Sequence, residues 1–135
     1  MISRLTPSSQ AWIDAVCSDF DGFLLDHAAN ERKASAMAMT FVVRYPDRTE
    51  ILEPMIQLAR EELTHFYRVF KLMQERGLCF QRDEQDPYMK RMLSSIQRGR
   101  NEEFLDRLVM ASVVEARGYE RFTTCLLYTS DAADE

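Results

Sequence analysis

Three long stretches of the chain place apolar residues at alternating spacings of four and three positions. This spacing is typical of one face of an α-helix that packs in a bundle. Long helices are therefore predicted over about residues 19–44, 50–76 and 101–124, and shorter ones over about 9–17 and 86–98. The chain has only 4 Gly and 4 Pro, and long stretches contain neither, which argues against a turn-rich β fold. The pattern predicts an all-α protein in which three long helices belong to a bundle.

Residues with known capping preferences predict where the helices begin and end. Ser18, followed by Asp21, is the expected N-cap of the first long helix. Pro46 should end that helix, because the residue before a proline avoids the helical conformation. Gly77 is the expected C-terminal stop of the second long helix, and Asn101 the expected cap of the third.

The second long helix has two polar residues in the middle of its apolar face. Glu62 and His65 lie one helical turn apart, in a Glu-x-x-His pattern. A charge at a core-facing position is costly unless it is paired. The complete face consists of Ile51, Met55, Leu58, Glu62, His65, Val69 and Leu72.

The other two long helices repeat this anomaly. Glu31 is the charged member of the face Leu24, Ala28, Glu31, Ser35, Ala38 and Val42. Glu115 is the charged member of the face Phe104, Leu108, Ala111, Glu115, Gly118 and Phe122. One glutamate on a predicted apolar face ordinarily means that the face of the helix was assigned wrongly by one position. Agreement among three helices instead predicts a shared site in the bundle interior.

Several carboxylates buried together are tolerated when they bind a polyvalent cation. Known di-iron bundles use one Glu from each of two helices and a Glu-x-x-His from each of two others. Here Glu31 and Glu115 match the single glutamates, and Glu62 with His65 matches one Glu-x-x-His. Oxygen-rich ligands with one imidazole favour iron or manganese. An iron pair with open positions reacts with O₂ and oxidises C–H bonds that no side chain attacks alone.

Charge and hydropathy restrict the class of protein and the cell compartment that we expect. The net charge of −5 argues against a protein that coats nucleic acid nonspecifically. No run of about 18 apolar residues is present, and the first ten residues lack the apolar core of a signal peptide. We therefore expect a cytoplasmic protein without membrane contact. The basic residues Lys90, Arg91, Arg98 and Arg100 are interpreted either as a solvated helix face or as contacts to the phosphates of a nucleic acid.

The last eleven residues differ in character from the rest. They read CLLYTSDAADE and resemble the translation of a sequencing adapter. We therefore expect a helical domain over residues 1–124, incomplete at its C-terminus, and a non-native tail over residues 125–135. A fourth bundle helix with a second Glu-x-x-His is expected to be missing. The chain alone should then bind iron weakly and show no turnover.

Four strings of the sequence resemble the MiaE-type tRNA hydroxylases, a ferritin-like di-iron monooxygenase family. They are LLDHAANERKASAMA, EPMIQLAREELTHFYRVFKLMQERG, DPYMKRML and EEFLDRLVMASVVEARGYERF, and the resemblance covers nearly all of residues 10–124. It implies a ferritin-like four-helix bundle and hydroxylation of the isopentenyl group of 2-methylthio-isopentenyladenosine beside the tRNA anticodon. Two iron ions, O₂ as co-substrate, an electron donor and tRNA are the implied cofactors and partners.

The resemblance also implies iron ligands. These are Glu31, Glu62, His65 and Glu115, while the family's two further ligands, a Glu and a His, have no counterpart in this sequence. His27, one turn before Glu31, is either a residue that orients this ligand or a partly exposed helix histidine. Arg60 and Arg117 either hydrogen-bond carboxylates or form surface ion pairs.

Two other functions remain open at this point. Another ferritin-like di-iron protein, such as a ferroxidase or a rubrerythrin-like protein, would use the same ligands, although the Cys-rich iron site common in rubrerythrins is absent from the sequence. A metal-free helical bundle used for interaction is the third interpretation. Metal analysis separates this last interpretation from the first two.

Overall fold

A computed structural model of the chain describes the backbone of residues 6–83 and 85–131, and side chains in these ranges as far as Cys125. All regular structure in these ranges is helical, as predicted. The order is α1 (Gln10–Ser18), α2 (Phe20–Arg44), α3 (Thr49–Glu75), α4 (Pro87–Ser94) and α5 (Arg100–Asp131). Among the described residues, no helix is both long and apolar enough to span a membrane. The chain divides into two compact units, residues 19–83 and residues 1–18 with 84–135, which are described separately.

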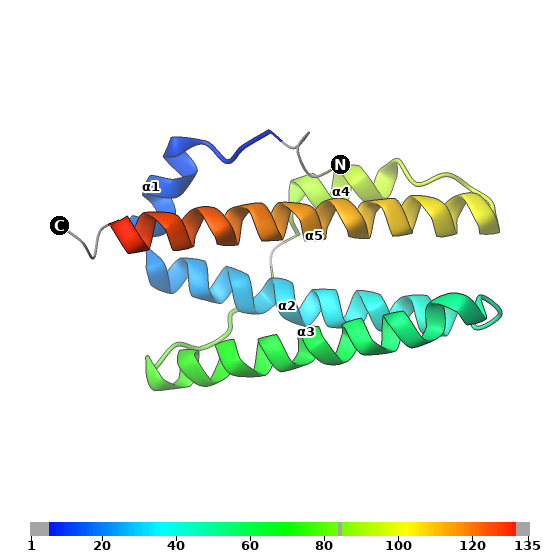
Figure 1. Cartoon of the computed structure of the whole chain (residues 1–135), viewed down its shortest axis with the longest axis horizontal. Helices are drawn as coiled ribbons and strands as arrows, with labels where there is room; N and C mark the ends of the chain where they lie inside the picture. The colour runs from blue at the N-terminus through cyan, green and yellow to red at the C-terminus, as the bar shows by residue number, and fades with distance from the viewer. Residues whose placement is uncertain (1–5, 84, 132–135) are drawn as a thin grey trace. The chain divides into compact units, whose positions relative to one another are not determined.

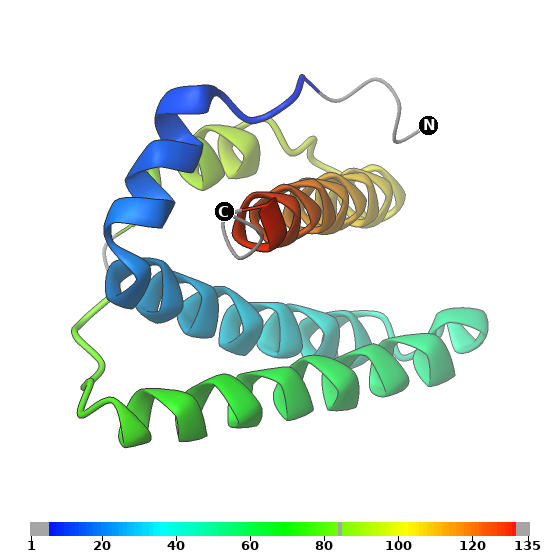
Figure 2. The same cartoon turned by 60° about the vertical axis from the view of Figure 1, so that its left-hand side comes forward.

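The first unit is a hairpin of two long helices. α2 and α3 lie side by side along their length, joined by a short turn after Tyr45 (Figures 1 and 2). The contact is made by the apolar face that the sequence predicts for α2, where Leu24 and Ala28 are buried together with Met73 of α3. Partly buried apolar residues surround this cluster, namely Leu25, Phe66, Val69, Leu78 and Phe80.

The predicted end of α2 is confirmed, and its predicted N-cap is wrong. Tyr45, just before Pro46, is the C-cap. The N-cap is Asp19, whose carboxylate accepts a hydrogen bond of 2.9 Å from the Gly22 amide. Ser18 instead ends α1, and its hydroxyl donates to the Ala15 carbonyl. Both residues are good caps, and the sequence pattern alone does not rank two adjacent candidates.

The C-terminus of α3 confirms the predicted role of Gly77. The Leu78 amide donates to the Met73 carbonyl at 2.9 Å, and the Gly77 amide donates to the Gln74 carbonyl at 3.0 Å. This pair of bonds is a Schellman motif, which requires a left-handed residue after the C-cap. Gly77 has a φ of 70°, which glycine adopts without strain.

Gly77→Ala is expected to lower the free energy of unfolding by about 1 kcal/mol, because a side chain in the left-handed conformation clashes with its own backbone. Gly118→Ala provides a control of opposite sign. Gly118 lies inside α5 with open space around a built Cβ, so alanine there should stabilise the protein by roughly 0.5–1 kcal/mol. Chemical denaturation measures both, and equal effects of the two substitutions would contradict the assigned roles.

The segment after α3 is attached to α2. Asp83 accepts two hydrogen bonds from the Arg32 guanidinium, at 2.8 and 2.9 Å. The same guanidinium lies 5.0 Å from the centre of the Phe80 ring, which packs on Phe66. These contacts cover the apolar core at the end of the hairpin that contains Gly77.

The second unit contains α1, α4 and α5, and several predicted boundaries differ here. α4 begins after Asp86, as predicted, but ends at Ser94 rather than near Arg98. α5 begins at Arg100, so Asn101 is not a cap. It also continues to Asp131, beyond the predicted end at Thr124, because CLLYTS contains no Gly or Pro to stop a helix.

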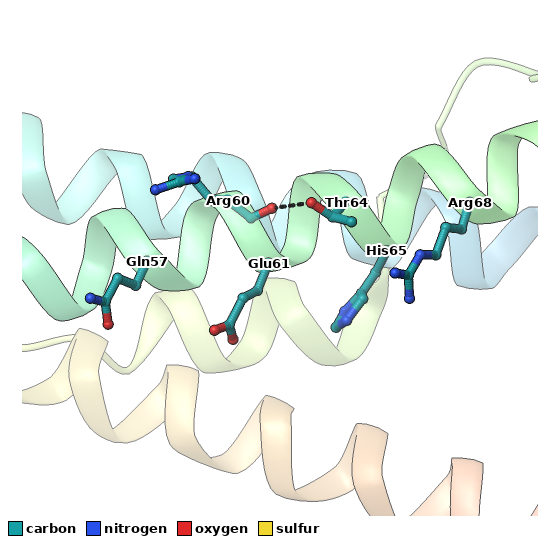
Figure 3. Close-up of a pocket in the computed structure, with 6 residues that line it drawn as sticks. All are labelled: Gln57, Arg60, Glu61, Thr64, His65 and Arg68. Atoms are coloured by element: carbon teal, nitrogen blue, oxygen red, sulfur yellow. Dashed lines mark hydrogen bonds between the residues drawn. The ribbon is translucent and has the colours of Figure 1, made fainter.

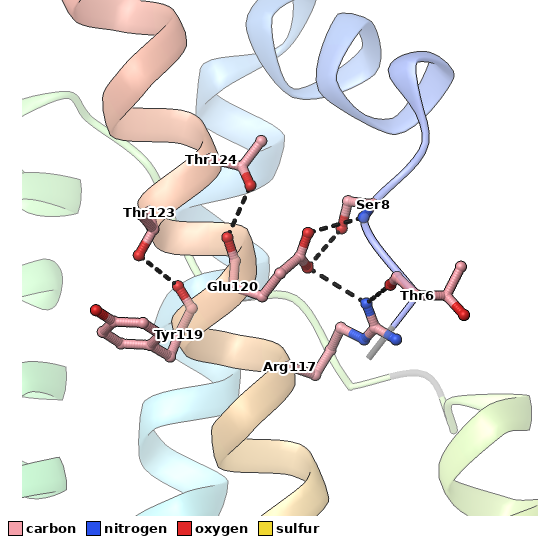
Figure 4. A network of polar contacts seen from close by, with 7 residues as sticks. All are labelled: Thr6, Ser8, Arg117, Tyr119, Glu120, Thr123 and Thr124. Carbon is pink, nitrogen blue, oxygen red and sulfur yellow. Dashed lines mark hydrogen bonds and ion pairs between the residues drawn. The ribbon is translucent and has the colours of Figure 1, made fainter. Parts of the chain in front are cut away.

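Polar contacts attach the N-terminal segment to α5 (Figure 4). The Glu120 carboxylate accepts hydrogen bonds from the Ser8 amide at 2.7 Å and the Ser8 hydroxyl at 2.9 Å. Arg117 donates to the Thr6 carbonyl at 2.6 Å and lies 3.3 Å from Glu120. Burial opposes the charge on Glu120, but these hydrogen bonds outweigh it and lower the pKa of Glu120.

Candidate metal centre

Three of the four predicted ligands converge between α2 and α3. Glu31 lies near the middle of α2, while Glu62 and His65 lie one turn apart near the middle of α3. One ligand atom from each of these residues lies within 4.8 Å of the other two. Packing of α2 on α3 therefore brings these polar residues together. The face predicted for α3 is partly wrong, because Met73 is buried in place of Leu72, which is exposed.

The imidazole is the centre of this cluster. His65 Nδ1 lies 3.4 Å from Glu31 Oε2 and 3.8 Å from Glu62 Oε2. The two carboxylates are mostly covered, with side chains that are 15% and 11% exposed, whereas the His65 side chain is 51% exposed. The carboxylates thus form the inner wall of the site, and the imidazole forms its solvent-facing side.

The surroundings of Glu62 disfavour its charged form. Burial, followed by the neighbouring Glu31 carboxylate, raises the pKa of Glu62 to about 7 from its ordinary value of 4.5. His65 opposes this effect but does not cancel it. Close carboxylates repel each other's charge, and one of them retains its proton until a cation replaces it.

An unsatisfied atom supports a cation at this position. Glu31 Oε2 is buried and accepts no hydrogen bond, although buried polar atoms in folded proteins nearly always have a partner. It is also the Glu31 oxygen that faces His65. Two carboxylates and one imidazole match the ligands that iron and manganese take in proteins. The residues present therefore fit the metal that the resemblance implies.

A hydrogen bond between the helices fixes their register beside the cluster. The Ser35 hydroxyl donates to the Ala59 carbonyl at 2.8 Å. Ser35 lies one turn after Glu31, and Ala59 lies three residues before Glu62. The bond therefore holds the two carboxylates opposite each other. The periodicity of the sequence placed Ser35 on the inner face of its helix, but no role was predicted for it.

Ser35→Ala should lower the free energy of unfolding by about 1 kcal/mol, because it removes a partly buried hydrogen bond between helices. Thr64→Ala is the matched control, since the Thr64 hydroxyl donates to the Arg60 carbonyl within α3 on an exposed surface. This control should change the free energy of unfolding by less than about 0.5 kcal/mol. Urea denaturation of both variants tests the difference, and equal losses would remove the proposed link between the helices.

His27 lies in the position expected for a residue that orients Glu31. Its Nε2 is 3.3 Å from Glu31 Oε1, and its ring stacks on Phe23 with the ring centres 6.0 Å apart. Burial lowers the pKa of His27, which favours the neutral ring. Neutral imidazole is a hydrogen-bonding partner that adds no charge to the site.

Arg60 and Arg117, which lie beside predicted ligands in the sequence, do not hydrogen-bond the carboxylates of Glu31 or Glu62. Arg117 contacts Glu120 and Thr6 rather than a predicted ligand. Arg60 is exposed, and its guanidinium makes no hydrogen bond or ion pair within the part of the chain that the structure describes. Arg60 therefore forms no ion pair with Glu31 or Glu62, and Arg117 is paired with Glu120.

His65 also lines a hollow of about 400 Å³ on the surface of α3. In Figure 3 the side chains of Gln57, Glu61, His65 and Arg68 extend from the same side of this helix. Arg60 and Thr64 complete the lining. One ligand of the candidate site is thus reached from a polar hollow.

Glu115 occupies a different unit from the other three residues. It lies near the middle of α5, and its side chain is exposed. Only one of the three predicted carboxylates is therefore exposed, while Glu31 and Glu62 face the α2–α3 interface. The membership of Glu115 in the site stays a prediction.

Known proteins resemble this chain over most of its length. Residues 3–134 match the family described as tRNA-(MS[2]IO[6]A)-hydroxylase (MiaE). A protein from Pseudomonas putida KT2440 is 32% identical over 116 residues, and one from Salmonella typhimurium LT2 is 32% identical over 73 residues. Both are named tRNA 2-(methylsulfanyl)-N(6)-isopentenyladenosine(37) hydroxylase.

These matches cover unequal shares of the proteins compared. The first match covers 86% of this chain and 57% of the P. putida protein. The second covers 54% of this chain and 27% of the Salmonella protein. This chain thus spans little more than half the length of the P. putida relative.

A solved structure shows the fold. It is described as protein 43 with aldehyde deformylating oxygenase activity from Synechococcus. The TM-score is 0.83 at 32% identity, over 87% of this chain and 59% of that one. The all-helical structure and this likeness confirm the predicted ferritin-like helical fold. From the match over residues 3–134 it follows that the chain belongs to the MiaE family of tRNA hydroxylases.

Proposed function

We propose that this protein acts in the iron-dependent hydroxylation of tRNA, on the isopentenyl group of 2-methylthio-isopentenyladenosine beside the anticodon. The observation that carries the proposal is the convergence of Glu31, Glu62 and His65 within 4.8 Å, in a chain of the MiaE family. The names of its relatives in P. putida and Salmonella support this substrate.

The proposed ligands are Glu31, Glu62, His65 and Glu115. Glu31 and Glu62 supply negative charge from a covered wall, and His65 supplies a neutral nitrogen from the exposed side. Two iron ions with O₂ would supply the oxidising power that breaks an unactivated C–H bond. Glu115 is proposed to supply a fourth ligand from α5.

The residues around the ligands have separate roles. His27 holds Glu31 in one orientation through its contact of 3.3 Å. Glu62 carries a proton near neutral pH in the metal-free state and releases it when a cation binds. The exposed edge of His65 leaves one side of the site open to small molecules from the hollow on α3.

The proposal is tested by mass spectrometry of nucleosides from tRNA that carries the substrate adenosine. The resemblance implies two further ligands, a Glu and a His, and residues 1–124 can be joined to the C-terminal region of the longer P. putida relative, in which we expect them. With ferrous iron, a reductant and O₂, this fusion should add the mass of one oxygen atom to the nucleoside. The same fusion with Glu62→Ala should give no product.

Other outcomes separate the alternative functions. Oxidation of ferrous iron without any nucleoside product would favour a ferroxidase. A fusion that folds but binds no iron would favour a helical interaction protein. A fusion that holds two irons and leaves the nucleoside unchanged would contradict the proposed substrate.

A further inference from the structure

The segment from Asp86 to Arg100 differs in charge from the rest of the chain. It contains four basic residues, Lys90, Arg91, Arg98 and Arg100, and one acidic residue, so its net charge is +3. The whole chain has a net charge of −5, so the remainder carries −8. A polyanion is therefore repelled by most of this protein and attracted to this segment.

The acidic residue of the segment is already engaged. The Asp86 carboxylate accepts a hydrogen bond of 2.8 Å from the Tyr88 amide at the N-terminus of α4. Lys90 and Arg91 lie in the middle of this helix, after which the chain turns toward α5 (Figure 1). The one carboxylate of the segment thus caps a helix and forms no ion pair with Lys90, Arg91 or Arg98.

The turn between α4 and α5 is well defined. The Gln97 amide donates to the Asp106 carboxylate at 2.8 Å, which ties the turn to the first part of α5. Gly99 has a φ of 118°, a conformation that other residues rarely adopt. Arg98 therefore has a defined position on the same continuous stretch as the cations of α4.

These cations lack the partners that other arginines of the chain possess. Arg32, Arg76 and Arg107 each form an ion pair with a carboxylate. Lys90, Arg91 and Arg98 are exposed, and their side chains form no hydrogen bond or ion pair within residues 6–83 and 85–131. Unpaired, solvated cations bind an external anion without first breaking an internal contact.

An aromatic ring accompanies the charges. Tyr88, two residues before Lys90, is 47% exposed. Exposed aromatic rings that alternate with Lys and Arg are typical of surfaces that bind RNA, because rings stack on unpaired bases and cations bind phosphates. A lipid headgroup layer would make use of the cations but gains little from a tyrosine on an eight-residue helix with no buried residue.

We propose that α4 and the turn into α5 form the surface that binds the phosphate backbone of the substrate RNA. This inference rests on the proposed function and adds the place where the RNA is held. The surface consists of Tyr88, Lys90, Arg91 and Arg98. Phosphate contacts position the RNA, and the metal site then acts on the modified adenosine.

The test compares two variants that each replace one Lys and one Arg. Lys90→Gln/Arg91→Gln removes two cations of the surface. Lys71→Gln/Arg82→Gln removes two exposed cations of residues 19–83 that form no ion pair with the described residues. The probe is a fluorescein-labelled anticodon stem-loop RNA without the modified adenosine, and its fluorescence anisotropy is measured over a range of salt concentrations with the 135-residue chain.

The surface variant should bind the RNA roughly three- to tenfold more weakly at 0.1 M salt. Its slope of log affinity against log salt should fall by about 2, because each cation that no longer neutralises a phosphate lowers the slope by about 1. The control variant should bind within about twofold of the original chain. Equal weakening in both variants, no weakening in either, or no RNA binding by the original chain would overturn the proposal.

Three further measurements check the fold of the variant, the independence of this inference from the proposed function, and the choice of RNA over lipid. Iron content should be unchanged by Lys90→Gln/Arg91→Gln, so a loss of iron would show that the substitutions disturb the fold. RNA binding that depends on these cations, without any hydroxylated nucleoside from the iron-loaded fusion, would defeat the proposed function and leave the RNA surface intact. Binding to phosphatidylserine vesicles in place of RNA would overturn the surface assignment.

Discussion

Replacing Glu62 or His65 with alanine is expected to abolish measurable iron binding while α2 and α3 stay helical. Each substitution removes one of three side chains whose ligand atoms lie within 4.8 Å of one another. Because loss of even an outer-shell partner lowers metal affinity by about 10- to 100-fold, loss of a direct ligand should cost at least about 100-fold. Anaerobic calorimetric titration with ferrous iron measures the affinity, and circular dichroism measures the helix content.

Glu61→Ala is the matched control for Glu62→Ala. The two glutamates are adjacent on α3, but Glu61 is exposed and lines the outer hollow, whereas Glu62 is 9% exposed and faces Glu31. Glu61→Ala should keep the iron affinity within about threefold, because an exposed charge one position from the site acts only through solvent. Equal losses in the two variants would show that general negative charge, rather than this ligand set, attracts the metal.

The second large effect is a dependence of iron affinity on pH. The pKa of Glu62 is about 7 in the metal-free protein, so below pH 7 a bound cation must displace its proton. The contribution of Glu62 should therefore make the affinity rise about tenfold per pH unit below 7 and level off above it. Calorimetry in buffers of different ionisation enthalpy should show proton release at pH 6 that largely disappears at pH 8.

The same proton predicts how the metal-free protein responds to pH. The carboxyl has its ordinary pKa of 4.5 when unfolded and a pKa of about 7 when folded, so the unfolded state loses the proton first. Stability of the metal-free protein should then fall as pH rises from about 4.5 to about 7. Glu62→Gln should remove this decline and be more stable than the original chain above pH 7. A decline that persists unchanged in Glu62→Gln would assign it to another group.

The position of these ligands could be predicted because helical periodicity places every third or fourth residue on one face. Glu62 and His65 interrupt an otherwise apolar face, and Glu31 does the same on the preceding helix. Packing of α2 on α3 then brings the three polar residues together, as the distances of 3.4 and 3.8 Å from His65 show. Periodicity contains no information on helix register, to which both the packing of Leu24 and Ala28 on Met73 and the hydrogen bond from Ser35 to Ala59 contribute here.

Helix ends were predicted less accurately than helix faces. Gly77 was correctly placed because its left-handed conformation excludes most other residues. The helix caps predicted at Ser18 and Asn101 were wrong, because neighbouring residues offer the backbone almost the same stabilisation. Asp19 caps α2, and α5 starts one residue before Asn101. The end predicted at Thr124 was wrong because a change in composition does not by itself break a helix.

The ion pair between Arg32 and Asp83 could not be predicted from the sequence. These residues are 51 positions apart, and no local pattern connects them. Contacts of this kind depend on the path of the chain after Gly77, which returns along α2. The role proposed for Glu115 has the same difficulty, because it depends on how α5 approaches the α2–α3 hairpin.

A crystal structure of the protein grown with iron, with anomalous diffraction recorded at the iron absorption edge, tests the central claim most directly. We predict anomalous density bonded to the carboxylates of Glu31 and Glu62 and to the imidazole of His65, with the Glu115 carboxylate completing this side of the site. Iron bound elsewhere on the chain, or iron held by these three residues with Glu115 remote from it, would contradict the proposed ligand set.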